Sequence, residues 1–265
     1  MTPLRQAMIQ AMQVRNFSVN TQQAYINAIK QLAVYYQRSP EHITEQETQH
    51  YILYLAKEKK LAWSTCNVIV SGIRFFYKTI LKKNQENFYL PHAKKPYHLP
   101  DILTKDEIKA LFNVTKNPRH SAIFMTAYSA GLRVSEIIHL TITDIDSQSG
   151  VICVREGKGK KDRYVPLSPR LLTELRHYWK AYRPAHWLFP GRDAIKPISR
   201  HAVSDAFDKA KRKARITKKV SIHSLRHAFA THLLEAGTEL FNIKSAWPQF
   251  YRYHLALCTT VQTAD

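Results

Sequence analysis

Three prolines in a short basic stretch divide this sequence. Pro91, Pro96 and Pro100 fall within PHAKKPYHLPDIL, where apolar residues follow neither a helical nor a strand period. Because proline interrupts helices and strands and biases the preceding residue towards extended conformations, the stretch predicts an extended linker. We therefore expect two domains, residues 1–90 and 103–244, joined by a linker at 91–102. In the tail at 245–265 the helical pattern is lost.

The first domain carries apolar residues at helical spacing. Behind a capping region at Ser18, Asn20 and Thr21, the apolar positions that predict a helix are Ala24, Tyr25, Ala28, Ile29, Leu32, Ala33 and Tyr36. Thr44 and Glu47 match a capping box ahead of a second apolar run. The positions of a further predicted helix are Ile69, Ile73, Phe76 and Ile80. The domain is therefore predicted to be a small helical bundle.

The second domain combines helices with a short β segment. Thr104 and Glu107 form another capping-box pair, and residues 121–130 predict a helix that leads into Gly131. The segment VICVREGKGKKDRYVPL alternates apolar residues around a Gly157-Lys158-Gly159 turn, which predicts a β-hairpin. Residues 199–214 again have helical spacing. The predicted fold class is mainly α with a small antiparallel β-sheet (α+β).

The chain is strongly basic, with 40 lysines and arginines against 20 aspartates and glutamates and a formal net charge of +20. Both predicted domains share this excess. Such charge favours nucleic acid as the partner, and charge alone does not separate DNA from RNA. Modules that read single-stranded RNA use aromatic stacking platforms, and we find no such motif.

Cysteine spacing and hydropathy indicate in which cellular compartment the protein is expected. Cys66, Cys153 and Cys258 lie far apart without a C-x-x-C pair, so the sequence predicts no zinc site, no disulfide framework and no other cofactor. No apolar run nears the roughly 18 residues that a membrane span requires, and the opening segment lacks the pattern of a signal peptide. We expect a cytoplasmic protein without a membrane partner.

Three local motifs supply candidate functional residues. In the segment 130–136 a glycine can end one helix and present Arg133 from the turn before the next. Lys158, flanked by glycines, can approach a phosphate or a groove closely. His223 and Arg226 are three residues apart at the start of a predicted helix, so they share one face near its positive end. Taken singly, each motif also fits a surface turn or helix end with solvated charges.

The order and separation of these motifs resemble the tyrosine recombinase, or phage integrase, family of the Xer-like kind. The resemblance starts with S-x-x-T-x-x-x-Y at Ser18, Thr21 and Tyr25. It continues through A-G-L-R-V-S-E and G-K-G-K-K-D-R to H-S-L-R-H-A-F-A-T-H-L-L-E-A-G, and so covers nearly the whole chain to about residue 244. It implies a core-binding domain at 1–90 and a catalytic domain at 103–244, which together clamp double-stranded DNA.

In this family a tyrosine attacks a DNA phosphate, which leaves a 3'-phosphotyrosyl link and a free 5'-hydroxyl. The resemblance implies that Arg133 and Arg226 hold the nonbridging oxygens, that Lys158 protonates the leaving oxygen and that His223 assists proton transfer. Aimed cations stabilise the charge of the transition state, and the scheme requires no metal. The side chains expected to contact DNA are Lys160, Lys161, Arg163, Lys209, Lys211, Arg212 and Lys213.

The end of the chain departs from the family. After residue 244 the family expects a segment like L-x-G-H-S-S-I-x-T-T-x-x-Y, which supplies a histidine and the nucleophilic tyrosine, whereas this chain reads S-A-W-P-Q-F-Y-R-Y-H-L-A-L-C. Tyr251 and Tyr253 fall several residues short of the expected place, and Pro248 would interrupt the expected helix. The nucleophile is therefore unknown and strand cleavage is expected to be impaired. The family's homotetramer is commonly assembled through the same C-terminal segment.

The genetic code offers one account of this departure. Codons for residues 246 onward exist that, read from their second base, encode H-G-H-S-S-I-A-T-T-L-R-Y-V, which contains the missing motif. We therefore hypothesise a small frameshift near Ser245, after which the tail is out of frame. The nucleotide sequence of the gene tests this directly, because codons that do not restore the motif in the shifted frame remove the hypothesis.

A protein of another class remains an alternative. A DNA-binding regulator or structural protein that never cleaved DNA would use the same Arg, Lys and His motifs only as phosphate contacts. Generic phosphate binding does not need an H-x-x-R at a helix end together with a glycine-flanked lysine. A recombinase or integrase by descent is therefore the favoured interpretation.

Overall fold

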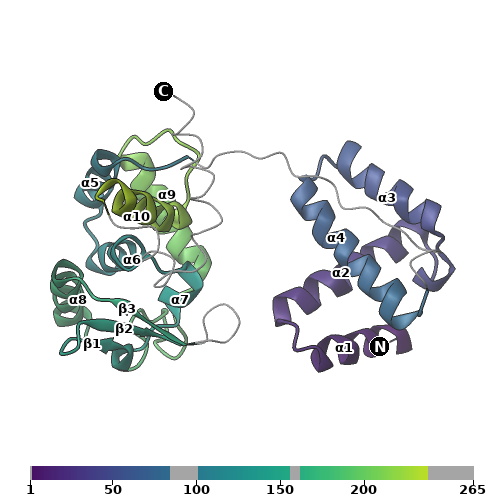
Figure 1. Ribbon diagram of the computed structural model, residues 1–265, viewed down its shortest axis with the longest axis horizontal. Coiled ribbons are helices and arrows are strands. Elements are labelled where there is room, and N and C mark those ends of the chain that lie inside the picture. Colours follow the sequence, from purple (N-terminus) through teal and green to yellow (C-terminus); the bar gives the residue numbers. More distant parts are fainter. Residues whose placement is uncertain (1, 84–100, 156–161, 238–265) are drawn as a thin grey trace. The chain divides into compact units, whose positions relative to one another are not determined.

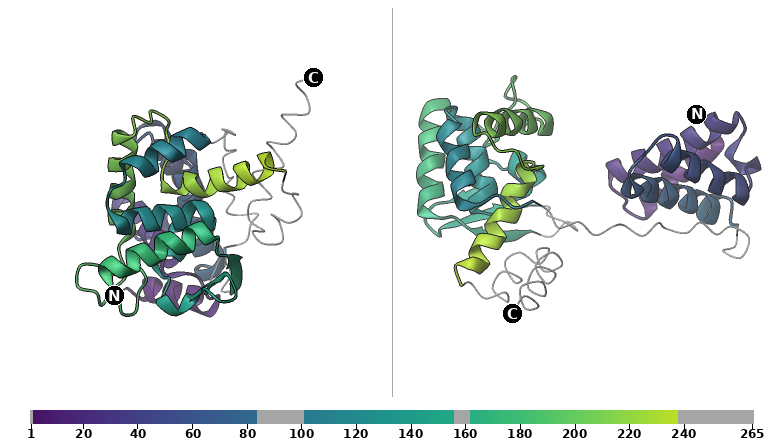
Figure 2. Two further views of the ribbon diagram at one scale, coloured as in Figure 1. Left: turned by 90° about the vertical axis from the view of Figure 1, so that its left-hand side faces the viewer. Right: turned by 90° about the horizontal axis from the view of Figure 1, so that it is seen from above.

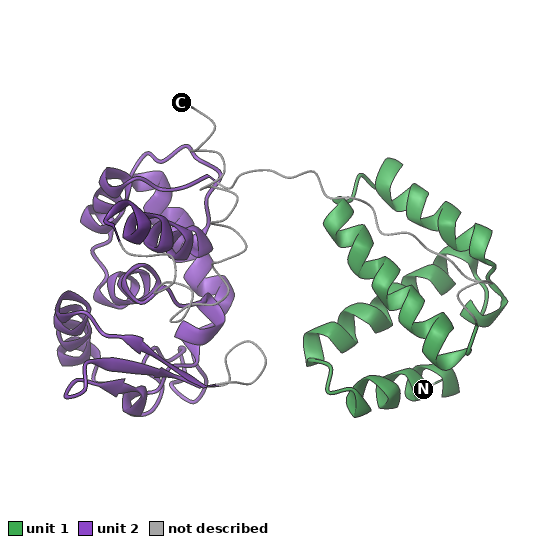
Figure 3. Ribbon diagram, in the orientation of Figure 1, with its two compact units in different colours: residues 1–98 green, residues 99–265 purple. Residues whose placement is uncertain are grey.

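The computed structural model describes residues 2–83, 101–155 and 162–237. The chain divides into two compact units, residues 1–98 and 99–265, and each has its own hydrophobic core (Figures 1 and 3). The predicted linker at 91–102 lies mostly outside the described residues, and the tail at 245–265 lies wholly outside them.

The first unit is a helical bundle, as predicted. Its helices are α1 (Pro3–Val14), α2 (Val19–Tyr36), α3 (Glu45–Lys57) and α4 (Trp63–Phe75). Ser18 caps α2 by accepting the N–H of Thr21, and Thr44 and Glu47 form the predicted capping box of α3. The helix predicted to run to Ile80 is regular only to Phe75 and continues as a π-helical turn over Phe76–Ile80. Here the buried Tyr77 hydroxyl donates to the carbonyl of Pro40 at 2.6 Å.

Helices α2 and α4 pack closely because a glycine stands between them. A Cβ atom on Gly72 would lie 3.0 Å from the Cα of Tyr25 and 3.2 Å from the Cβ of Ala28. Such contacts are tighter than side chains normally allow, so the absence of a side chain at this position permits the close approach. The packing brings the N-terminal halves of both helices to one face of the unit.

The second unit contains the helices α5 (Lys105–Val114), α6 (Pro118–Ser129), α7 (Val134–Ile138), α8 (Pro169–Tyr182), α9 (Arg200–Lys213) and α10 (Ile222–Glu235). Strands β1 (Ile145–Asp146), β2 (Val151–Val154) and β3 (Arg163–Pro166) form an antiparallel sheet in the order β1-β2-β3. The predicted α+β class is thus confirmed. Figure 1 shows the sheet beside α8 at one end of this unit, and Figure 2 gives two further views of α10, which packs against α6.

The sequence patterns described above predict neither α1, α8 nor β1. The signal for α8 is present: Ser168 accepts the N–H of Leu171, Pro169 occupies the first helical position, and the buried Leu171, Leu175 and Tyr178 follow at helical spacing. Strand β1 has two residues, too few for a pattern to form. No described helix is long and apolar enough to cross a membrane.

Candidate functional site

Three arginines of the second unit surround one buried carboxylate. Arg133 reaches Oε1 of Glu136 at 2.7 Å, and Arg163 lies 2.8 Å from Oε2. Nη1 of Arg226 lies 3.7 Å from the same Oε2. The Glu136 side chain is 6% exposed. Arg133 and Arg226, which are 93 positions apart in the sequence, are thus brought to one place, as the motif analysis expected.

The turn after α6 builds this cluster. Gly131 has a φ of +59°, a left-handed conformation that glycine adopts without strain, and its carbonyl accepts a hydrogen bond from Nη1 of Arg226. Arg133 is the N-cap of α7, and its backbone N–H donates to Oε2 of Glu136 at 2.9 Å. The carboxylate therefore closes the start of the helix and neutralises part of the arginine charge at the same time.

Burial shapes the ionisation of the cluster. It favours the neutral form of the Glu136 carboxyl, but hydrogen bonds and charge from Arg163 and Arg133 outweigh burial and hold the pKa of Glu136 below its ordinary value. Burial, reinforced by the charge of Arg133 and partly offset by Glu136, lowers the pKa of Arg226 to about 9. At neutral pH the Arg226 guanidinium therefore still carries its charge.

His223 stands beside the arginines at the start of α10. Burial, together with the charges of Arg226 and Arg133, lowers the pKa of His223 below the ordinary histidine value, and Glu136 opposes this only in part. The ring of His227 packs edge-on against that of His223 with a centroid separation of 5.0 Å. His223 is thus a mostly neutral imidazole at pH 7, able to exchange a proton close to the cationic groups.

This arrangement is suited to an anion. Three guanidinium groups share one carboxylate, so the cluster retains positive charge in a largely buried setting, where electrostatic attraction is stronger than in water. Planar guanidinium groups match the geometry of phosphate oxygens. Lys158, Lys160 and Lys161 lie outside the described residues, as do Tyr251 and Tyr253.

The other basic residues singled out in the sequence lie elsewhere or are already engaged. At the C-terminal end of α9, Lys209, Arg212 and Lys213 are exposed and Lys211 is half-buried. Cations at this end also interact favourably with the helix dipole, so their position has a structural explanation too. The Arg163 guanidinium donates to both carboxylate oxygens of Glu136, and its side chain is only 18% exposed. The expected DNA contact of Arg163 stays a prediction, and in the structure this side chain is paired with Glu136.

Glu136 is a member of this cluster that the sequence motifs do not single out. The structure makes it the shared partner of three arginines. Its position three residues after Arg133 is the spacing of a capping pair, which is the available sequence signal. Among residues 2–83, 101–155 and 162–237, no group of three or more His, Cys, Asp or Glu residues could hold a metal ion.

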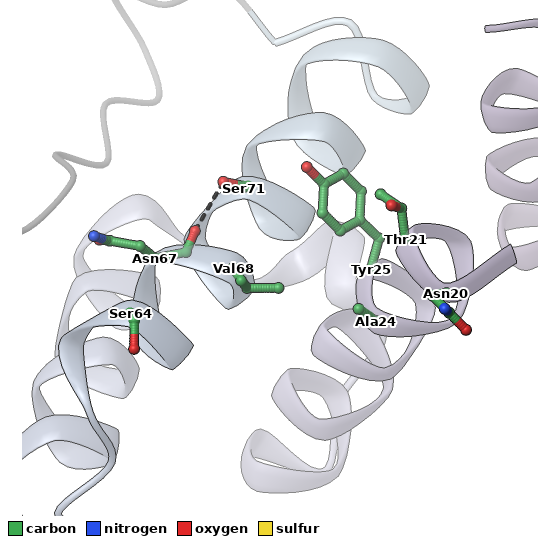
Figure 4. A pocket seen from close by; sticks show the side chains of 8 residues that line it. All are labelled: Asn20, Thr21, Ala24, Tyr25, Ser64, Asn67, Val68 and Ser71. Carbon is green, nitrogen blue, oxygen red and sulfur yellow. Dashed lines mark hydrogen bonds between the residues drawn. The ribbon is translucent and has the colours of Figure 1, made fainter. Parts of the chain in front are cut away.

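A second candidate surface lies on the first unit, in the groove between α2 and α4 (Figure 4). Its volume is about 460 Å³. The residues that line it are Asn20, Thr21, Ala24, Tyr25, Ser64, Asn67, Val68 and Ser71. The lining contains no charged side chain, while amides, hydroxyls and one exposed valine are present. Such side chains can hydrogen-bond to the base edges of DNA and contact thymine methyl groups.

Comparisons of sequence place both units in known families. The model of the phage integrase family matches residues 101–246, and that of the phage integrase N-terminal SAM-like domain matches residues 4–87. The putative integrase/recombinase y4qK of Sinorhizobium fredii is 46% identical over 261 residues, which cover 98% of this chain and 83% of the relative. Tyrosine recombinase XerA of Pyrococcus horikoshii is 32% identical over 219 residues, which cover 81% of this chain and 76% of the relative.

Solved structures share the fold. A crystal structure of XerA recombinase aligns with a TM-score of 0.51 at 28% identity, covering 91% of this chain and 87% of that one. A lambda integrase dimer bound to a COC' core site aligns with a TM-score of 0.71 at 18% identity, covering 91% and 92%. The Tn1549 transposon integrase in complex with circular intermediate DNA aligns with a TM-score of 0.70 at 18% identity, and the alignment covers 96% of this chain and 95% of that one. With family models matched along most of its length, the chain belongs to the phage integrase family of tyrosine recombinases.

Proposed function

We propose that this protein binds double-stranded DNA and that its arginine cluster receives one backbone phosphate at the site where recombinases of the family break and rejoin strands. The observation that carries the proposal is the convergence of Arg133, Arg226 and His223 around Glu136. The lambda and Tn1549 relatives, whose structures are DNA complexes, support the choice of DNA.

Each described member of the cluster has a role that its surroundings favour. Arg133 and Arg226 hold the nonbridging oxygens of the phosphate, because planar donors match them and the buried setting strengthens the attraction. His223, held neutral beside these cations, accepts and returns a proton. Lys158 protonates the leaving 5'-oxygen, and a tyrosine forms the 3'-phosphotyrosyl intermediate in the family's reaction. No metal or other cofactor enters this scheme.

The first unit acts as the core-binding half of a clamp on the duplex. The groove between α2 and α4 supplies polar, uncharged side chains for the base edges.

In the second unit, basic side chains contact the DNA backbone. They are Lys160, Lys161, Lys209, Lys211, Arg212 and Lys213. A protein that acts on DNA in this way would work in the cytoplasm. Members of the family assemble as homotetramers on DNA. That assembly commonly uses the C-terminal segment, which is the segment altered in this chain.

We further propose that strand cleavage is impaired in this chain, because the final histidine and tyrosine motif is missing. The match to the family model ends at residue 246, where the sequence departs from the motif. The alignment with y4qK covers 98% of the chain and so reaches into the tail, at an overall identity of 46%. If cleavage is absent, the remaining activity is DNA binding, which is also the alternative function of a regulator or structural protein.

Removing either phosphate-binding arginine tests the proposal. A duplex is selected from a random pool by the unaltered protein, and binding is measured over a series of salt concentrations. In Arg133→Ala and in Arg226→Ala, affinity falls by about tenfold and the slope of log affinity against log salt falls by about 0.9, because one phosphate contact is lost. Thermal unfolding shows that each variant is folded.

Arg176→Ala is the matched control, since Arg176 is an exposed arginine of α8 in the same unit. Its affinity and slope stay those of the unaltered protein. If Arg133→Ala and Arg226→Ala also leave both quantities unchanged, the cluster is not the phosphate site.

A further inference from the structure

We propose that Arg163 is a positioning residue: it fixes the Glu136 carboxylate so that the carboxylate does not draw Arg226 away from the phosphate site, instead of contacting DNA itself. This inference rests on the proposed function of the cluster. It assigns to a conspicuous member of the basic hairpin a role that its charge alone would not suggest.

The first step is the geometry of the pair. Nη1 of Arg163 donates to Oε1 of Glu136 at 3.1 Å and Nη2 donates to Oε2 at 2.8 Å, so the guanidinium and the carboxylate form a bidentate pair. Such fork-to-fork pairs are among the strongest charged hydrogen bonds and fix the plane of the carboxylate. The pair uses one donor on each Nη of Arg163, so the guanidinium cannot turn towards a DNA backbone without losing both bonds to Glu136.

A neighbouring arginine shows the contrast. Arg155, which follows β2, pairs with Asp144 through Nε at 2.8 Å, and its side chain is 64% exposed. The partner of Arg155 is buried, but the arginine itself faces solvent. Arg163, at the start of β3, is instead enclosed with its partner. Two arginines of the same hairpin region thus occupy opposite environments.

The second step concerns how the carboxylate is shared. Oε1 of Glu136 accepts from Nη1 of Arg133 and from Arg163, while Oε2 accepts from the backbone N–H of Arg133 and from Arg163. Nη1 of Arg226 lies 3.7 Å from Oε2, beyond hydrogen-bond distance, and donates instead to the carbonyl of Gly131. Each oxygen of Glu136 therefore already accepts two hydrogen bonds, from Arg133 and from Arg163.

The consequence follows from charge. Without Arg163, each oxygen of Glu136 loses one hydrogen-bond donor. The buried carboxylate then gains by moving closer to the remaining cations, Arg133 and Arg226. An anion at the cluster would then compete with Glu136 for those two arginines. With Arg163 in place the two Nη donors hold the carboxylate where it is, and Arg226 stays 3.7 Å from it. It also ties the start of β3 to α7, so the sheet and the helix that bears Arg133 are fixed to each other.

The test reads the pKa of the His223 ring by NMR in the free, full-length protein. Arg226, Arg133, Glu136 and the ring of His227 face His223, and the glutamate charge favours the protonated imidazole. In Arg163→Met the released carboxylate approaches these groups, so we expect the pKa of His223 to rise by about 0.5 units, the size of a partial charge displacement at an effective dielectric near 20. Arg163→Lys keeps the charge but not the fork, and we expect it to show most of the same rise.

Two controls separate positioning from general disturbance. Arg155→Met removes an exposed arginine near the same hairpin and leaves the pKa of His223 unchanged. Adding Arg163→Met to Glu136→Gln produces no further shift, because the carboxylate through which Arg163 acts is already neutral. If Arg163→Met does not fold, Arg163→Lys provides the same reading.

DNA binding by the Arg163 variants distinguishes the rival role. If Arg163 is a positioning residue, Arg163→Lys weakens binding while the salt slope stays the same. A salt slope lower by about 0.9 in Arg163→Met, with the pKa of His223 unchanged, would make Arg163 a phosphate contact and overturn the inference. A pKa in Arg163→Lys equal to that of the unaltered protein would also overturn it. The pKa is measured without DNA, so it decides the role of Arg163 even if Arg133→Ala shows that the cluster binds no phosphate.

Discussion

Glu136→Gln lowers the free energy of unfolding by about 3 kcal/mol, the loss expected when one charge of a buried ionic cluster is removed and its partners stay. Three guanidinium groups lie within 4 Å of this carboxylate, and the neutral amide leaves their mutual repulsion uncompensated. The side chain is 6% exposed, so water replaces little of the lost attraction. Denaturant unfolding followed by circular dichroism measures the change.

The effect of Glu136→Gln depends on pH in a defined direction. The pKa of the Glu136 carboxyl is lowered in the folded protein, so its contribution to stability is complete above the unfolded pKa, near 4.5. It is lost as the pH falls through the lower, folded pKa. The stability difference between the two proteins is therefore constant from pH 5 to 7 and shrinks below about pH 4.5.

Asp106→Asn is the control for a carboxylate in an exposed pair. Asp106 pairs with Lys109 on α5 at 3.1 Å, and both side chains are mostly exposed. Its loss costs below about 1 kcal/mol, since solvent screens the pair. Equal losses in Glu136→Gln and Asp106→Asn would contradict the view that a buried charge network organises this site.

Restoring the shifted reading frame turns a binding protein into a cleaving one. We expect the chain with H-G-H-S-S-I-A-T-T-L-R-Y-V in place of residues 246–258 to form a covalent adduct with a nicked suicide duplex. The unaltered chain forms at least about a hundredfold less, because displacement of a reacting group by even about 1 Å costs that much. Electrophoresis under denaturing conditions detects the adduct, and phenylalanine in place of the single tyrosine of the new segment abolishes it.

The unaltered chain provides the opposing outcome. An adduct formed without the replacement, and lost in Tyr251→Phe or Tyr253→Phe, would show that the tail supplies its own nucleophile. Cleavage would then not be impaired, and the frameshift would not be needed to explain the activity. Without that result, DNA binding with no adduct fits a recombinase that has lost its final motif.

Local signals in the sequence predicted most of the helices. The capping boxes at Thr44 and Thr104 both begin helices in the structure, because a side chain that satisfies free backbone N–H groups acts within a single turn. The hairpin strands followed from alternation, and Gly131 marked the end of α6. Such features depend on residues close together in the chain, which a sequence displays directly.

The organisation of the candidate site depended on contacts that no local pattern contains. Arg133 and Arg226 were singled out by motif, but their common partner Glu136 emerged only when distant segments folded together. Arg163 illustrates the limit best. In the sequence it belongs to a run of exposed-looking basic residues, whereas the register of β3 turns its side chain into the cluster. Long-range pairing decides such burial, and a charge run does not record it.

Scanning a selected duplex with single neutral methylphosphonates is the most direct measurement of the phosphate site. If Arg133 and Arg226 hold the same backbone phosphate, one substituted position weakens binding by about tenfold, and the penalty at that same position shrinks in Arg133→Ala and in Arg226→Ala alike. If the two variants instead remove penalties at different positions, or at none, the arginines do not meet on one phosphate and the account of this site is wrong.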